Sequence, residues 1–443
     1  MNDDRYVAAI EISSSKIIAA VGRMYADGRL EVIAVDQERG VDSVRYGFIQ
    51  NLEETSTRIM RVIDRLQRKP SVAPRIITGL YVGLSGRSLR NIRTEVSISL
   101  PDETEITDDI LKRLRDQALT TAIDSSLEVV DAIPRTYYVG KSETHSPKGA
   151  IGNGIRAVFD LIVCRPEMRR NLTRTISDKV GIDVKGYVVT ALSTAQVILT
   201  SEEKRLGCML VDMGAETTSV SIYKDGSLRY FATLPLGGRN ITRDIVTLSV
   251  LEERAEEIKM SMANAMNREV SSFNINGVKM TEVNSLTVAR AEEIVANIVE
   301  QVKYAGMKDS DLPAGIICIG GGMRLNGMID LLSRQTGLRV NRGKLPGYVT
   351  IDDSKTSASE LLQVASILYS GATASADDEC LEMPGANELP VTGEGNEDDP
   401  EETPRERVEP SGGRRNRLWQ KFHDRVANIF KTPGEDDSDL IDE

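Results

Sequence analysis

YVAAIEISSS at residues 6–15 and CMLVDMGAETT at residues 208–218 share one pattern. In each, an apolar run ends near an acidic residue, Glu11 or Asp212, and a short loop of small and polar residues follows. A second apolar run comes next and leads through an Asp-Gly dipeptide, which favours a tight hairpin turn, into a third run. The sequence therefore predicts the same unit twice: strand, acidic loop, strand, hairpin turn, strand.

A loop of this kind is suited to hold a phosphate group. Small residues between two buried strands let backbone N–H groups converge on an anion, and Ser and Thr hydroxyls add further donors. A carboxylate at the strand end can hold a metal ion, usually through water. Two such units facing each other would grip a polyphosphate and its Mg²⁺ from both sides. Two ordinary, unrelated hairpins are the alternative interpretation.

The composition narrows the class of protein. With 443 residues, 40% of them hydrophobic, the chain has room for about two to four domains. Its net charge of −12 argues against nucleic-acid binding. The two histidines, His145 and His423, cannot form a multi-histidine metal site, and they make a Ser/His or Cys/His triad improbable. Widely spaced cysteines, no signal-peptide pattern and no apolar run of about 18 residues predict a soluble body in a reducing cytosol.

Three shorter motifs follow in the second half of the chain. Gly237-Gly238 precedes a predicted helix. Glu256 and Lys259 lie one turn apart on the next helix, where a surface ion pair is the plainer interpretation. The run from Gly320 to Met323 ends a buried strand, and its three glycines would let the backbone approach a nucleotide closely or would simply serve a tight turn.

The C-terminal part has a different composition. Residues 375–413 are acidic and contain several Pro and Gly, which predicts a disordered linker. Residues 414–431 predict a basic amphipathic helix that lies in a membrane interface, although a helix packed on the body or on a partner is the alternative. Its apolar residues are Leu418, Trp419, Phe422, Val426, Ile429 and Phe430, and its basic residues are Arg414, Arg415, Arg417, Lys421 and Arg425. Residues 432–443 form an acidic tail that would weaken attraction to anionic lipid.

In this order, the motifs resemble those of the actin-like ATPase superfamily. The matching set is the two acidic loops, Gly237-Gly238 with Thr242 and Asp244, the E-x-x-K helix and the triple-glycine loop. The small insertion after residues 81–86, the linker and the tail helix resemble, more specifically, the FtsA family of bacterial cell-division proteins. This resemblance implies an α/β, actin-like (RNase H-like) duplicated two-domain fold with an FtsA-type α+β insertion, a disordered tail and a C-terminal amphipathic helix.

The resemblance also implies a division into subdomains. The expected segments are 1–86, 161–206 and the return segment 351–374 for subdomain 1A, 87–160 for the inserted subdomain 1C, 207–236 and 305–350 for subdomain 2A, 237–304 for subdomain 2B, 375–413 for the linker, 414–431 for the membrane-targeting helix and 432–443 for the acidic tail.

Carried onto this sequence, the resemblance implies a site for ATP and Mg²⁺. The phosphates would lie against Ser13, Ser14, Ser15 and Lys16 in the first loop and against Gly214, Ala215, Glu216, Thr217 and Thr218 in the second. The ribose and adenine would be surrounded by Gly237, Gly238, Glu256 and Lys259, and the adenosine loop would be Gly320, Gly321, Gly322 and Met323. Glu11 and Asp212 would hold Mg²⁺ through water and would be the candidate catalytic acids.

Three departures from the superfamily pattern bear on activity. The first loop has Glu11 where Asp is more usual and Ser13 where Gly is usual. The second loop has Ala215 and Glu216 in place of two glycines, and the acid should weaken ATP binding by repulsion unless it points away or contacts Mg²⁺. Residues 189–193, where the ATPases have a water-orienting Gln or Glu, contain neither, so we expect ATP hydrolysis to be slow at most.

Together these features predict an ATP-binding assembly protein of cell division. It would polymerise at the cytoplasmic face of the inner membrane at the division site, held peripherally on anionic lipid by its tail helix. The expected partners are the C-terminal tail of FtsZ, further copies of the chain and later division proteins, with residues 87–160 used for self-association. Arg290 and Glu293 are candidate FtsZ contacts, although surface ion pairing is the plainer interpretation. An actin-fold sugar kinase and a nucleotide-free membrane scaffold are the alternatives.

Overall fold

The computed structural model describes residues 4–267, 274–275, 277–352, 357–375 and 379–384. The predicted tail helix at 414–431 and the acidic tail at 432–443 lie outside these residues, as does nearly all of the predicted linker. Within the described part of the chain, no helix is both long and apolar enough to cross a bilayer.

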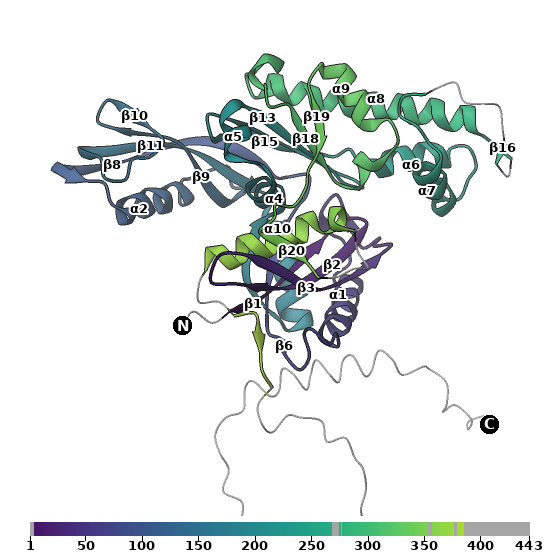
Figure 1. Ribbon diagram of the computed structural model, residues 1–443, viewed down its shortest axis with the longest axis horizontal. Helices are drawn as coiled ribbons and strands as arrows, with labels where there is room; N and C mark the ends of the chain where they lie inside the picture. Colours follow the sequence, from purple (N-terminus) through teal and green to yellow (C-terminus); the bar gives the residue numbers. More distant parts are fainter. Residues whose placement is uncertain (1–3, 268–273, 276, 353–356, 376–378, 385–443) are drawn as a thin grey trace, which may run out of the picture.

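Two sheets with the same strand arrangement form the two halves of the molecule (Figure 1). Each contains an antiparallel three-stranded meander, and each meander is extended beyond its first strand by two parallel strands. In the first half, β20 also pairs with the third meander strand. The first sheet consists of β1 (Arg5–Ile12), β2 (Lys16–Met24), β3 (Leu30–Arg39), β7 (Gly79–Leu84), β12 (Asp183–Val189) and β20 (Val349–Ile351). The matching strands of the second half are β13 (Cys208–Met213), β14 (Thr218–Lys224), β15 (Ser227–Leu234), β18 (Ile316–Ile319) and β19 (Val340–Arg342). The predicted duplication is therefore confirmed.

The meander strands form where apolar residues run on without interruption, because both faces of each sheet are covered. Residues 7–10 and 17–21 are fully buried, as are Cys208 to Val211. The second hairpin turns at Asp225 and Gly226, which both have positive φ (55° and 76°), as a type I′ turn requires.

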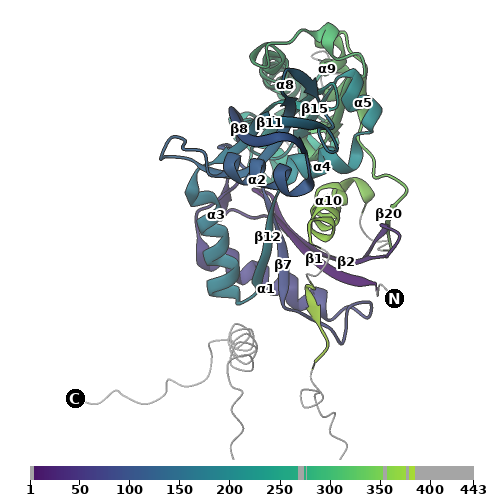
Figure 2. The same ribbon diagram turned by 90° about the vertical axis from the view of Figure 1, so that its left-hand side faces the viewer.

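The helices cover these sheets and join the halves. α10, the last helix among the described residues, packs on β1, β2 and α4 and lies between the first sheet and the second half (Figures 1 and 2). The helices of the first half are α1 (Leu52–Gln67), α3 (Pro166–Thr173), the π-helix η1 (Arg174–Val180), α4 (Thr190–Ile198) and α10 (Ala358–Ala374). Those of the second half are α5 (Ser201–Leu206), α6 (Gly238–Val246), α7 (Glu252–Ser261), α8 (Met280–Tyr304) and α9 (Met328–Thr336). The remaining short elements are β4 (Val44–Arg45), β5 (Phe48–Ile49), β6 (Ile76–Ile77), β16 (Asn274–Ile275), β17 (Val278–Lys279), β21 (Leu381–Glu382), η2 (Asp309–Asp311) and η3 (Gly321–Arg324).

The insertion has its own core and projects from one side of the molecule (Figure 1). It contains β8 (Arg90–Glu105), α2 (Asp108–Leu119), β9 (Glu128–Val139), β10 (Ser142–Thr144) and β11 (Ile151–Cys164). Although it interrupts the first half in sequence, its sheet joins that of the second half, where Arg90 pairs with Ala232. Asn91 reinforces this joint, since its side chain accepts from Phe231 N (2.8 Å) and donates to the buried Asp160 (2.7 Å).

Local contacts explain where several of these elements begin and end. Val188 and Val189 extend β12 because β7 offers their backbone a parallel partner. The long helix α8 begins at Met280, which is buried against the second core. Helix α1 begins after Asn51, whose side chain accepts from Glu54 N (3.1 Å) as its cap.

Candidate nucleotide site

The two predicted acids lie at matching ends of β1 and β13. Glu11 and Asp212 are both buried, and each carboxyl group interacts electrostatically with Lys16. Burial raises the pKa of Glu11 to about 7; Lys16 opposes that shift, and the neighbouring Asp212 carboxylate adds to it. Burial likewise raises the pKa of Asp212 to about 6, against a hydrogen bond from Gln363 and the charge of Lys16. The repeat thus brings two carboxylates together in a low-dielectric place, where neither stabilises the fold.

These carboxylates have the chemistry of a site for a hard divalent cation. Glu11 Oε2 and Asp212 Oδ1 are buried and accept no hydrogen bond from any described residue. A cation would satisfy both oxygens and offset their mutual repulsion. Two carboxylates are sufficient for Mg²⁺, because it keeps several waters and takes one or two carboxylates plus substrate phosphates.

The two loops leave backbone donors available beside these acids. In the first loop, Ser13 closes a tight turn with Lys16 (N to O, 2.9 Å), while the amides of Ser14 and Ser15 donate to no described residue. In the second loop, Gly214 N donates to Thr217 O (2.8 Å), and the amides of Ala215 to Thr217 are likewise unused within the described chain. Amides without an acceptor in consecutive loop positions are the donors that an anion-binding loop requires.

The triple-glycine loop lies directly against Asp212. Gly320 has a φ of +90°, and a Cβ there would meet Met213 O at 2.3 Å and Asp212 Oδ1 at 2.7 Å. A Cβ at Gly237, in turn, would meet Ala215 O at 2.6 Å. Both glycines are needed for close backbone approach, so the structure brings residues 237–238 and 320–323 to the second acidic loop.

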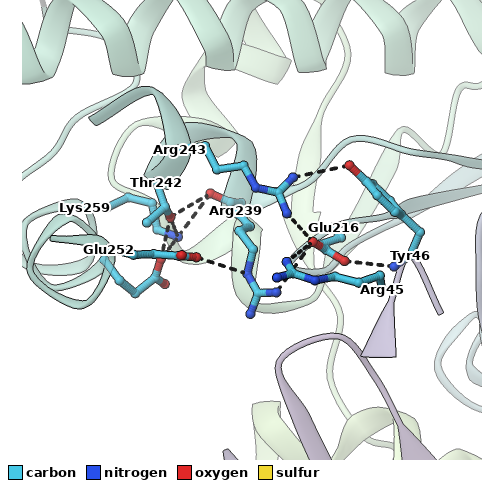
Figure 3. Close-up of polar contacts among 10 residues, drawn as sticks. Arg45, Tyr46, Glu216, Arg239, Thr242, Arg243, Glu252 and Lys259 are labelled. Atoms are coloured by element: carbon cyan, nitrogen blue, oxygen red, sulfur yellow. Dashed lines mark hydrogen bonds and ion pairs between the residues drawn. The ribbon is translucent and has the colours of Figure 1, made fainter. Parts of the chain in front are cut away.

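Glu216 does not face the predicted phosphate position as a free charge (Figure 3). Its carboxylate is fully buried and accepts from Arg243 (2.5 Å), Arg45 (3.0 Å) and Tyr46 N (2.8 Å). Arg239 adds an ion pair at 3.5 Å. We call Arg45, Tyr46, Glu216, Arg239 and Arg243 the Glu216 cluster.

The Glu216 cluster joins the two halves of the molecule. Arg45 and Tyr46 belong to the β4–β5 hairpin of the first half, whereas Arg239 and Arg243 lie on α6 of the second. With three guanidinium groups around one carboxylate, the local charge is positive. The expected repulsion between Glu216 and a bound polyphosphate is therefore offset by its own partners.

Stability should depend on pH through this cluster. Burial alone would raise the pKa of Glu216, but hydrogen bonds from Tyr46 N and Arg45, the charge of Arg239 and a hydrogen bond from Arg243 together lower it. A lowered folded-state pKa contributes stability above the unfolded value of about 4.3, and that stability is lost as the pH falls through the folded value. We expect the melting-temperature difference between wild type and Glu216→Gln to be constant from about pH 7 to pH 5 and to narrow below about pH 4. A difference that widens on acidification would contradict this assignment.

Glu256 and Lys259 pair with each other at 2.6 Å. Lys259 also donates to Gly238 O (3.1 Å) and Thr242 (2.9 Å), and Glu256 accepts from Thr242 at 2.5 Å. The pair is therefore held against the first turn of α6, beside Gly238, and is more than a free surface ion pair (Figure 3). Burial lowers the pKa of Lys259, although Glu256 opposes that shift.

The two candidate FtsZ contacts also pair with each other. Arg290 donates to Glu293 (2.5 Å) and, through two nitrogens, to Asp244 (2.6 and 3.0 Å). Within the chain, Arg290 and Glu293 therefore form an ion pair, which was the plainer of the two interpretations of these residues.

Sequence reasoning missed several residues that the fold brings to the site. Gln363 Nε2 donates to Asp212 Oδ2 at 2.6 Å. Glu360 pairs with Arg39 (2.7 Å) and, from the second half, Arg324 (2.8 Å), while its carbonyl accepts from Lys16 Nζ (3.0 Å). The start of α10 thus contacts the first loop and, through Arg324, the triple-glycine loop. The sequence does not reveal these contacts, because α10 is far from both acidic loops along the chain and approaches them only in the folded structure.

Family models and individual relatives both match this chain. The family model described as "Cell division protein FtsA" matches residues 209–359, and that of the "SHS2 domain inserted in FTSA" matches residues 86–163. The cell division protein FtsA of Porphyromonas gingivalis (strain ATCC BAA-308 / W83) is 31% identical over 342 residues, covering 74% of this chain and 71% of the relative. This chain belongs to the FtsA family. The FtsA proteins of Bacillus subtilis (strain 168) and Escherichia coli (strain K12) are 27% and 25% identical, covering 80% and 77% of this chain and 81% and 84% of those proteins.

Solved structures bear on the fold of this FtsA family member. A chain of the PilM-PilN type IV pilus biogenesis complex is 16% identical and matches with a TM-score of 0.57, covering 82% of this chain and 98% of that chain. The duplicated actin-like α/β fold with an FtsA-type insertion is thereby confirmed. The SHS2 family model matches the inserted segment, whose sheet joins that of the second half.

Proposed function

We propose that this FtsA family member binds ATP with Mg²⁺ between its two acidic loops and assembles in a nucleotide-dependent way at the membrane. The observation that supports this most directly is the pair of facing acidic loops. Each combines a buried carboxylate oxygen without a hydrogen-bond partner in the described chain and consecutive amides without an acceptor there. A polyphosphate with a divalent cation supplies the partners that both sets of groups need.

Each residue of the site would have a distinct task. The amides of Ser14, Ser15 and residues 215–217 would donate to phosphate oxygens, and Lys16 would add positive charge. Glu11 and Asp212 would hold Mg²⁺ through water, and the metal would neutralise phosphate charge when bound. Residues 237–238 and 320–323, which pack closely on the second acidic loop, would line the nucleoside, with Glu256 and Lys259 at its edge.

The remaining features of the proposal concern location and partners. The tail helix at 414–431 would bind anionic lipid of the inner membrane, so that the protein lies at the cytoplasmic face of the division site. Many weak tail helices in one polymer would give avidity. FtsZ, through its C-terminal tail, and later division proteins would be partners. We also retain the subdomain boundaries given above as a proposal.

Co-sedimentation with anionic liposomes, with and without Mg-ATP, tests this function. ATP-dependent recruitment supports a polymerising membrane anchor with a working nucleotide site. Recruitment that is indifferent to ATP would favour the nucleotide-free scaffold, and no recruitment, together with phosphate transfer to a small molecule, would favour the kinase.

The tail prediction has its own test. Trp419→Glu combined with Phe422→Glu should abolish liposome binding, because two charges on the apolar face oppose insertion into the interface. The body should remain folded, as judged by an unchanged melting temperature. A matched double variant on the acidic tail, Asp436→Asn with Asp437→Asn, should leave binding intact. Unchanged co-sedimentation of the Trp419/Phe422 variant would exclude this helix as the anchor.

A further inference from the structure

An amide side chain lies against the acids of the candidate site. Gln363, on α10, is half-buried and donates through Nε2 to Asp212 Oδ2 at 2.6 Å. Its Oε1 accepts no hydrogen bond from any described residue. The amide is planar, so fixing its nitrogen on Asp212 also holds its free acceptor oxygen close to that carboxylate.

The backbone that carries Gln363 is firmly placed. The flanking residues Leu362 and Val364 are buried in the core of the first half. One turn earlier, Glu360 O accepts from Lys16 Nζ of the first acidic loop. Gln363 is therefore held by packing and by a contact to the loop that would bind phosphate, which is the preorganisation that a positioning group requires.

The neighbouring helix α4 offers weaker candidates for a positioning group than Gln363. On α4, Ser193 and Thr194 direct their hydroxyls to Thr190 O, at 2.9 and 2.8 Å, so both are used within the helix. Thr190 Oγ1 is buried without a partner among described residues, and a single hydroxyl fixes a neighbour less well than an amide that is itself held. Glu11 and Asp212 would be occupied with Mg²⁺.

We propose that Gln363 orients the water molecule that hydrolyses the bound nucleoside triphosphate. This inference rests on the proposed nucleotide site. Gln363 Oε1 accepts a hydrogen bond from the water, whose oxygen forms a bond to the terminal phosphorus. The bond from that phosphorus to the bridging oxygen breaks, the nucleoside diphosphate leaves with the electron pair, and the proton of the water passes to the released phosphate and then to solvent. A neutral amide is not a base, so its contribution is alignment.

Full-length protein with Mg-ATP in single-turnover phosphate release tests the inference, with calorimetric binding of Mg-AMPPNP as the second readout. Gln363→Leu should slow release by at least about tenfold and leave the AMPPNP dissociation constant within about twofold, because the phosphate-binding groups are untouched. Gln363→Met, which keeps the unbranched shape, should behave alike and guards against misfolding of the leucine variant. Gln335→Leu, an exposed glutamine on α9, is the matched control and should change neither readout.

The outcomes separate this inference from the proposed function. Wild-type protein that binds no nucleotide overturns the proposed site and this inference with it. Wild-type protein that binds but releases no phosphate, or Gln363 variants that hydrolyse at the wild-type rate, overturn the inference alone. A parallel loss of AMPPNP binding would show that Gln363 only supports Asp212, which also overturns the water-orienting role.

Discussion

Glu216→Ala is expected to lower the free energy of unfolding by about 3 kcal/mol. The substitution removes a fully buried carboxylate and leaves Arg45, Arg239 and Arg243 facing one another without their shared counter-charge. Arg239 is the most buried of the three and bears most of the cost, whereas Arg45 and Arg243 are more than a third exposed and are partly screened by water. This places the loss at the lower end of the range for breaking a buried ion pair. Urea denaturation monitored by circular dichroism measures it.

Glu257→Ala is the matched control for this prediction. Glu257 pairs with Arg254 at 2.7 Å on the surface of α7, and both side chains are largely exposed. Its removal should cost about 0.5 kcal/mol or less. Equal effects of the two substitutions would show that the Glu216 cluster contributes no more than an ordinary surface pair.

The same variant decides what Glu216 does to nucleotide affinity. If its charge repelled phosphate, alanine would tighten Mg-ATP binding. Because three arginines and a backbone amide already engage the carboxylate, we expect no tightening beyond about twofold in calorimetry, which is less than about 0.5 kcal/mol. A tenfold gain in affinity would restore the repulsion hypothesis.

The sequence was sufficient for features that depend on neighbouring residues. Both three-stranded units could be predicted because apolar runs, loops of small residues and Asp-Gly turns are local signals. The ordered series of glycine and acidic motifs then indicated which loops meet. Helix α1 also follows a local signal, because Asn51 caps a strongly amphipathic stretch.

The sequence was insufficient where distant segments decide the outcome. Nothing near Glu216 in sequence reveals that Arg45 approaches it from the first half, so its charge was taken as repulsive toward phosphate. Gln363 was missed because α10 returns to the site after residue 350. The strand conformation of Val188 and Val189 depends on the parallel partner strand β7, which lies about a hundred residues earlier in the chain.

Asp212→Asn is expected to weaken Mg-ATP binding by about 10- to 100-fold, while making the nucleotide-free protein more stable. The isosteric amide removes the charge that attracts the metal but keeps an oxygen that can accept from Gln363. Burial raises the pKa of Asp212 to about 6, so its charge at pH 7 costs more free energy in the folded protein than in the unfolded chain. Removing that charge should raise the free energy of unfolding by about 1–3 kcal/mol at pH 7, measured in metal-free buffer by urea denaturation.

Asp212→Asn should weaken ligand binding but raise stability. This combination distinguishes a ligand-binding carboxylate from a structural one. For a structural carboxylate such as Glu216, removing the charge costs stability, because its partners lie within the chain. For Asp212 the missing partner is a cation from solution, so the protein tolerates strain that only the ligand relieves. Asp225→Asn, an exposed acid in the hairpin of the same repeat unit at a positive φ that Asn accommodates, should change neither quantity appreciably. An Asp212→Asn protein that binds Mg-ATP like wild type, or that loses stability, would place Asp212 among the structural residues and remove the second acidic loop from the metal site.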